Sequence, residues 1–322
     1  MKKIKISSYG IMMLVFFLST CFFNPFVSSI ILKTTYNDSW ISMIIGFLSG
    51  FIILWLALKL DLVKNQNIID RNNKNIFGKF LNIILCILII ILSSTLLIKT
   101  TTFISNNYLN SMSVLLISII SFLVIMYATF KGIEPIVRTG QILFTICIII
   151  SLAYIIMLIY YMDITNILPI LNHSIWDIII SSIYYLVFSL LPILVILIIP
   201  KNLVNDDYYN RCILTGYFIA FIYNVIFVLS TIFVGNSFVI DSFDYPTYFV
   251  INNIKYFSFI ERLDNIFTIP HIFSIFMFLI MSLLFINEFI KNLFKIKKDN
   301  IYVLSVISLI IIIVSLTFRL IL

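Results

Sequence analysis

The chain has 322 residues, of which 62% are hydrophobic and only 11% are charged, against about 45–50% and about 25% in soluble domains. No water-soluble fold has enough interior to bury that much apolar surface, so the composition excludes a soluble protein and predicts an all-α polytopic membrane protein. The net charge is +7, but the basic residues are scattered and form no patch interleaved with aromatic residues, which argues against a nucleic-acid partner.

Nine apolar segments are long enough to cross the hydrocarbon core of a bilayer, about 30 Å thick, as helices. The basic N-terminus is similar to the start of a secretory signal, but no small-residue cleavage site follows and eight more spans come after it. We therefore expect a retained first helix. The predicted spans are residues 9–32, 39–60, 80–105, 112–130, 139–161, 175–200, 212–235, 264–290 and 300–321.

The distribution of Lys and Arg predicts how these spans are oriented. With a cytoplasmic N-terminus, the inner segments hold 16 of the basic residues and the outer segments hold 5. Because positive residues concentrate in cytoplasmic loops, this asymmetry predicts a cytoplasmic N-terminus. It also accounts for the basic excess without a polyanionic ligand.

The outer connection before the eighth predicted span follows a different pattern from the other loops. After Pro246 and Thr247 it places Phe249, Ile254 and Phe257 among polar residues, which is typical of an amphipathic interfacial helix. We expect this segment to lie in the headgroup region or to fold over an outer vestibule as a lid.

Two predicted spans are interrupted by proline: the first at Asn24-Pro25 and the sixth at Pro192. Proline removes a backbone hydrogen bond, and open backbone at membrane depth is tolerated only where it is buried or lines a cavity. We expect one transmembrane domain made of two five-helix halves, 9–161 and 175–322. The two breaks then correspond and indicate a midplane binding site in an inverted-repeat fold. Ordinary proline kinks are the alternative.

Two titratable residues inside the spans are candidates for ligand binding. Lys99 is set back about two turns from the end of the third span, and an intramembrane charge favours an anionic partner such as a ligand carboxylate. Snorkelling to the interface is the alternative. His271 lies early in the eighth span, where a hydrogen-bonded structural role is the alternative to ligand binding.

The remaining features favour structure over chemistry. Ser42, Gly46 and Gly50 recur every four residues and predict a stripe on which a neighbouring helix packs closely. The four cysteines are far apart and form no C-x-x-C pair, so we expect apolar filler rather than a metal site or a disulfide. The sequence contains no P-loop, G-x-G-x-x-G or H-E-x-x-H motif, so we expect neither an enzyme nor a cofactor.

Three stretches carry a resemblance to a known family. They are Asp38-Ser39-Trp40-Ile41-Ser42, Tyr127-Ala128-Thr129-Phe130-Lys131-Gly132-Ile133-Glu134 with Arg138, and Pro246-Thr247 followed by Phe259-Ile260-Glu261-Arg262-Leu263-Asp264. In order and spacing the chain resembles the B-subunit family of spore germination receptors, within the amino acid–polyamine–organocation transporter superfamily, from near residue 9 to about 300.

The resemblance implies a ten-helix inverted-repeat fold in the inner membrane of bacterial endospores, in a complex with an A subunit and a lipoprotein C subunit. It implies that a small nutrient, typically an amino acid, binds between the broken first and sixth helices, with the third and eighth closing the pocket. Since only nine spans are predicted, we expect the second half to lack its last helix. The implied ligand-binding residues are Thr20, Cys21, Asn24, Pro25, Lys99, Thr102, Phe188, Ser189, Pro192, His271 and Ser274.

Three functions are compatible with these observations. The first is a nutrient-sensing receptor subunit that triggers spore germination through a ligand-dependent shift between two states. The second is a secondary transporter of amino acids or amines, which uptake into proteoliposomes would reveal. The third is an assembly subunit of the receptor that binds no ligand of its own. We take the receptor subunit as the main prediction.

Overall fold

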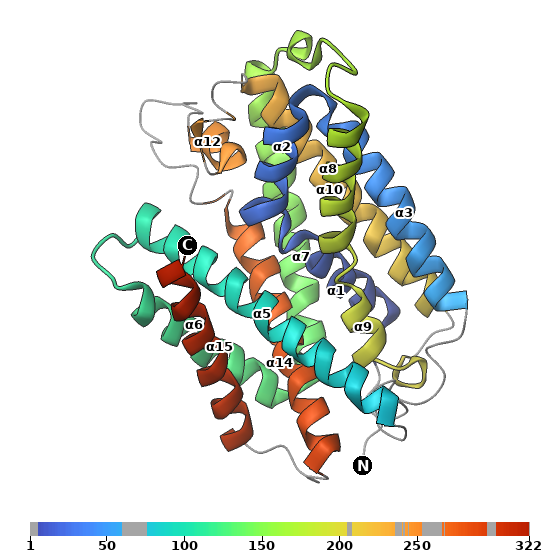
Figure 1. The fold of residues 1–322 in the computed structure, drawn as a ribbon, viewed down its shortest axis with the longest axis vertical. Coiled ribbons are helices and arrows are strands. Elements are labelled where there is room, and N and C mark those ends of the chain that lie inside the picture. Colours follow the sequence, from blue (N-terminus) through green and yellow to red (C-terminus); the bar gives the residue numbers. More distant parts are fainter. Residues whose placement is uncertain are drawn as a thin grey trace.

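A computed structural model describes residues 6–59, 76–204, 208–235, 240, 242–243, 245–252, 266, 268–294 and 301–321. This part of the chain is helical apart from turns, loops and one isolated bridge between Ile6 and Val204. The helices in Figure 1 are α1 (Ser8–Thr20), α2 (Ser28–Thr35), α3 (Ser39–Lys59), α5 (Ile76–Asn107), α6 (Val114–Lys131), α7 (Ile133–Leu158), α8 (Ile175–Ser189), α9 (Ile193–Ile198), α10 (Tyr209–Val234), α12 (Pro246–Asn252), α14 (Ile269–Phe294) and α15 (Ile301–Ile321).

Eight continuous apolar stretches of the described chain are long enough to cross a membrane. The first, Ser8–Lys59, has 52 residues, more than twice the length that one crossing needs. It turns back at Tyr36–Asp38 and therefore supplies two crossings, which with the seven other stretches makes nine in the described residues. The prediction of an all-α polytopic membrane protein is confirmed. The division into two repeats stays a prediction.

The start of the fifth span differs from the prediction, which placed it at residue 139. The helix α7 begins at Ile133, and only Gly132 separates it from the end of α6 at Lys131. Gly132 reverses the chain alone because it adopts φ +89°, a conformation that is open to glycine. Arg138 donates to Glu134 over 2.6 Å, so the charged first turn pairs within itself.

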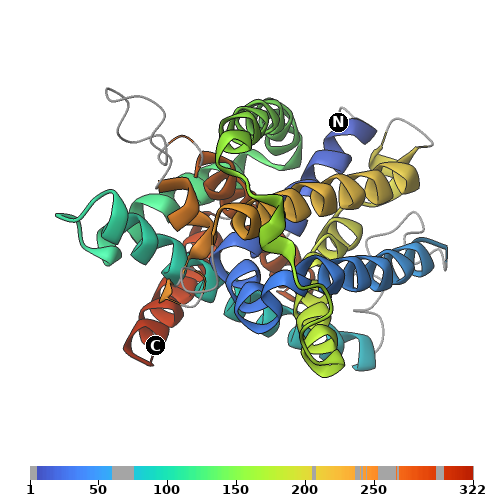
Figure 2. The same cartoon turned by 90° about the horizontal axis from the view of Figure 1, so that it is seen from above.

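The centre of the bundle is formed by α1, α10 and α14. Every side chain from Met13 to Leu18 of α1 is at most 1% exposed. An added Cβ at Gly216 of α10 would overlap the Met12 carbonyl oxygen of α1, so these two helices touch through their backbones. Figure 2 shows α3 and α10 on one side of the molecule and α15 on the opposite side. The outer helices expose Ile, Leu and Phe side chains, as a lipid-facing surface requires.

Both expected helix breaks are present. The first helix passes from α1 through a turn into a π-helical segment, Phe23–Val27, around Pro25, and then continues as α2. A π-helical turn is a usual place for such a kink because the backbone bonds shift by one residue there. The sixth helix ends as α8 at Ser189 and resumes as α9 at Ile193.

The end of the bundle opposite the N-terminus carries the Tyr36–Asp38 turn, the loop 159–174 and α12, and we call it the distal face. The Asp38 side chain is fully buried and joins two of these segments. It accepts hydrogen bonds from the Leu171 N–H (2.6 Å) and the His173 N–H (3.1 Å) and lies 3.1 Å from His173 Nδ1. Asp38 thus ties the turn after α2 to the loop that leads into α8.

The predicted amphipathic helix before the eighth span is present in part as α12, Pro246–Asn252. This helix packs on α2 and α10 at the distal face. The residues Ile254 and Phe257, which belong to the same prediction, lie outside the described residues.

Candidate functional site

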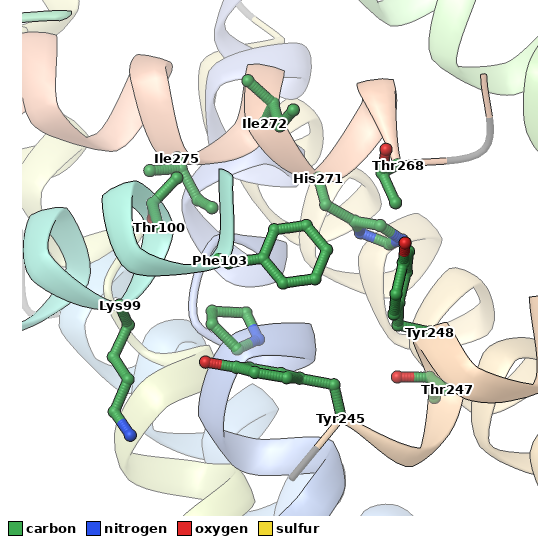
Figure 3. A pocket seen from close by; sticks show the side chains of 11 residues that line it. Lys99, Thr100, Phe103, Tyr245, Thr247, Tyr248, Thr268, His271, Ile272 and Ile275 are labelled. Atoms are coloured by element: carbon green, nitrogen blue, oxygen red, sulfur yellow. The ribbon is translucent and has the colours of Figure 1, made fainter. Parts of the chain in front are cut away.

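A small cavity lies beneath α12, between α5, α14 and the break in the first helix (Figure 3). Its volume of about 60 Å³ corresponds to about four to six water positions, at about 10–15 Å³ each. This space suits a compact ligand of a few heavy atoms. The cavity is lined by Pro25, Lys99, Thr100, Phe103, Tyr245, Thr247, Tyr248, Thr268, His271, Ile272 and Ile275.

Aromatic rings form the roof of this cavity and hold α12 against α5. The Phe103 ring of α5 meets Tyr245 and Tyr248 edge-on, with centroids 5.3 and 4.9 Å apart. The Tyr108 ring, at the end of α5, contacts both Phe103 and Tyr248, and its hydroxyl lies 2.9 Å from Thr268 Oγ1. The roof therefore connects three segments that are far apart in the sequence.

Lys99 is the one formal charge among the lining residues. Its Nζ lies 5.6 Å from the centre of the Phe26 ring, and within the described residues no carboxylate comes within 4 Å of it. In Figure 3, Lys99 and His271 lie on opposite sides of Phe103. The His271 ring packs against Phe227, with centroids 5.2 Å apart. A cation without an anionic partner beside aromatic walls favours a ligand with a carboxylate.

The structure brings three of the predicted ligand-binding residues together: Pro25, Lys99 and His271 all line the cavity. Two others, Thr20 and Ser274, are buried and hydrogen-bonded to each other over 3.0 Å, which joins α1 to α14.

Thr102 and Cys21 do not line the cavity. Thr102 donates to the Ile98 carbonyl of its own helix (2.7 Å), and the buried Cys21 thiol donates to the Leu18 carbonyl. The side chain of Asn24 lies outside the described residues.

The predicted residues of the sixth helix lie apart from the cavity. The Phe188 ring stacks on Phe22, with centroids 5.0 Å apart at 24°, so aromatic rings occupy the space between the two breaks. Ser189 Oγ lies 2.8 Å from the Tyr217 hydroxyl, and Pro192 is buried at the start of α9. The open space therefore lies on the distal side of this aromatic stack rather than between the breaks.

Sequence reasoning did not select Phe103, Tyr245, Tyr248 and Thr268 as site residues. The sequence contains part of the information that was needed to select them. Phe103 follows Lys99 by four residues, which places both side chains on one helix face. Tyr245 and Tyr248 flank the Pro246-Thr247 pair that contributed to the resemblance. Only the packing of α12 on α5 shows that these rings share a cavity.

A family model described as spore germination protein matches residues 3–320, almost the entire chain. The chain belongs to the spore germination protein family. Among proteins with curated descriptions, none matches this germination protein. Within its described residues, no group of three His, Cys, Asp or Glu side chains is placed to hold a metal ion.

Proposed function

We propose that this germination protein is the nutrient-sensing subunit of a germinant receptor and that the cavity beneath α12 binds the nutrient, a small amino acid. The observation that carries the proposal is the position of Lys99, a cation without a described carboxylate partner, in the wall of a small cavity that also contains the first helix break. By its resemblance, the chain would act with an A subunit and a lipoprotein C subunit in the inner membrane of the spore, with its N-terminus in the cytoplasm.

The chemistry of the cavity suits a zwitterion. The ligand carboxylate would pair with the Lys99 ammonium group, and the ligand ammonium group would lie against the Phe103, Tyr245 and Tyr248 rings, which attract cations through their faces. Pro25, at the break of the first helix, also lines the cavity. This site is displaced toward the distal face from the predicted one, because Phe22 and Phe188 occupy the space between the breaks.

Signal transmission would follow from the place of the cavity in the fold. A ligand there touches α12, α5, α14 and the π-helical segment at once, so it would favour whichever arrangement of the first helix and the α12 roof encloses it best. The shift between two states is limited by the ligand's difference in affinity for them. The partner subunits would read that shift.

The test is the germination of spores that carry Lys99→Ala, measured as a dose-response curve for single amino acids. Losing one charge-assisted interaction of about 1.5–3 kcal/mol raises the required nutrient concentration about tenfold to a hundredfold. Lys33→Ala is the matched control, because Lys33 is an exposed lysine of α2 that does not line the cavity. Equal curves for both variants and the parent, at equal protein levels, would contradict the proposed site.

A further inference from the structure

A second hollow lies at the opposite end of the bundle from the cavity beneath α12. The helix α3 runs from the distal face to Lys59, and α10 begins beside that end at Tyr209. Between them is a groove of about 310 Å³ that is lined by Trp55, Leu58, Lys59, Asn210, Arg211 and Leu214. The proposed nutrient site accounts for none of these residues.

Two cations share this groove, and aromatic rings position both of them. Lys59 Nζ lies 4.8 Å from the centre of the Trp55 ring, and Arg211 Cζ lies 5.7 Å from the centre of the Tyr208 ring. Both basic side chains are exposed. Within the described residues, no carboxylate oxygen lies within 4 Å of either cation. Among the described residues, the groove therefore presents two positive charges without a carboxylate partner.

Two other described basic residues near helix ends are paired with carboxylates. Arg138 is paired with Glu134 (2.6 Å), and Lys291 with Glu288 (3.0 Å). Lys131 lies over the Tyr127 ring at 5.2 Å, as Lys59 lies over Trp55, but it does not line this groove. Lys59 and Arg211 line the same groove, and lysine and arginine side chains are suited to bind phosphate oxygens.

The surroundings of the groove suit a lipid rather than a soluble anion. Trp55 is 43% exposed at the end of a spanning helix, where tryptophan side chains lie at the level of the headgroups. One turn deeper along α10, the Phe218 ring is 48% exposed and contacts Phe47 of α3, with centroids 5.9 Å apart. An acyl chain that left the groove toward the membrane centre would lie on these apolar side chains.

We propose that this groove binds the phosphate of an anionic phospholipid, with Lys59 and Arg211 as its ligands. Basic pockets between transmembrane helices are suited to such headgroups. The N-terminus of α10 adds the partial positive charge of its helix dipole at the same place. Bound lipid would join the ends of α3 and α10 on the side of the bundle that faces away from the nutrient cavity.

The experiment is native mass spectrometry of the purified full-length protein in detergent, offered equal amounts of phosphatidylglycerol and phosphatidylcholine with identical acyl chains. We expect the parent protein to retain phosphatidylglycerol about tenfold more than phosphatidylcholine. The double variant Lys59→Gln/Arg211→Gln should lose that preference, and the control Lys131→Gln should keep it. A thermal unfolding curve for each variant shows whether it is folded.

Two results would overturn the proposal. The acidic residues at positions 61, 206 and 207 are close in sequence to Lys59 and Arg211 and lie outside the described residues. If these carboxylates neutralise the two cations, the double variant will keep the lipid preference of the parent protein. If glycerol phosphate at millimolar concentration displaces phosphatidylglycerol, the groove is a site for soluble anions and not for a lipid. The lipid site is supported if glycerol phosphate does not change the retention of phosphatidylglycerol and only the double variant abolishes it.

Discussion

At the scale of single residues, Asp38 shows how one buried carboxylate organises the distal face. Burial alone would raise the pKa of the Asp38 carboxyl, but hydrogen bonds from the Leu171 and His173 N–H groups, together with the His173 ring, outweigh it and lower the pKa below its ordinary value. Leu171 adopts φ +60°, an uncommon conformation for a leucine. The bond from its N–H to Asp38 holds it there.

The lowered pKa predicts that acid destabilises the distal face. A carboxyl whose pKa is lower in the folded state contributes stability above its unfolded pKa, near 3.9, and that contribution is lost as the pH falls through the folded value. We expect the unfolding temperature of the purified protein to fall as the pH drops below about 4. Asp38→Asn should remove this dependence and cost about 2 kcal/mol or more at pH 7, because charge-assisted bonds are lost.

Asp163→Asn is the control for that measurement. Asp163 belongs to the same loop and is exposed, with Thr165 as its hydrogen-bond partner. The bonds from Thr165 also lower the pKa of Asp163, but solvent screens an exposed carboxylate, so this substitution should change the unfolding temperature much less. An acid transition that persists in Asp38→Asn would assign the pH dependence to another group.

At the scale of helices, the small-residue stripe of α3 explains how the second broken helix is held. An added Cβ at Gly46 would lie 2.6 Å from the Ser182 carbonyl oxygen of α8, and one at Gly50 would overlap the Tyr217 hydroxyl of α10. The stripe that Ser42, Gly46 and Gly50 form in the sequence is therefore a close contact between helices, as predicted. It fixes α3 against α8 at Ser182, about two turns before the break at Ser189.

Two glycine substitutions test this packing. Gly46→Ala should lower the unfolding temperature by several degrees, since the backbone of α8 must move to admit the methyl group. Gly140→Ala places its Cβ 2.7 Å from Met277 Cε, the flexible end of a side chain that can rotate away, so its effect should be smaller. Equal unfolding temperatures for the two variants would show that α8 is not held through Gly46.

At the scale of the whole molecule, the two ends of the bundle differ in chemistry. The distal face holds the aromatic roof, the cavity beneath α12 and the Asp38 contacts, whereas the other end holds the groove with Lys59 and Arg211. The excess of basic residues on the N-terminal side predicts that this side is cytoplasmic. A nutrient would then reach its cavity from outside.

Single cysteine variants measure this orientation. In intact bacterial cells, a membrane-impermeant thiol reagent should label Asn172→Cys, which replaces an exposed residue of the distal loop. It should label Lys131→Cys, at the end of α6, only after the cells are permeabilised. Of the native cysteines, Cys21, Cys86 and Cys147 are buried, so Cys212 is the one to replace beforehand. The reverse pattern of labelling would invert the predicted topology.

The sequence by itself determined the fold class, the nine spans and the positions of both helix breaks. These properties are local: an apolar run of about 20 residues must be helical in lipid, because its backbone has no other hydrogen-bond partners there. Proline at positions 25 and 192 interrupts that helix wherever it packs. Lys99 and His271 were identified for the same local reason, as polar groups within apolar runs.

Only the tertiary structure decided where the cavity lies. Its lining residues come from three segments, 99–103, 245–248 and 268–275, together with Pro25. The hydrophobic periodicity of one helix does not indicate which other helices it will contact. The Phe22–Phe188 stack, which fills the space between the breaks, depends on the fit of two side chains that are far apart in the sequence. Packing of this kind depends on how the shapes of side chains from different helices fit together, so it is determined only in the folded structure.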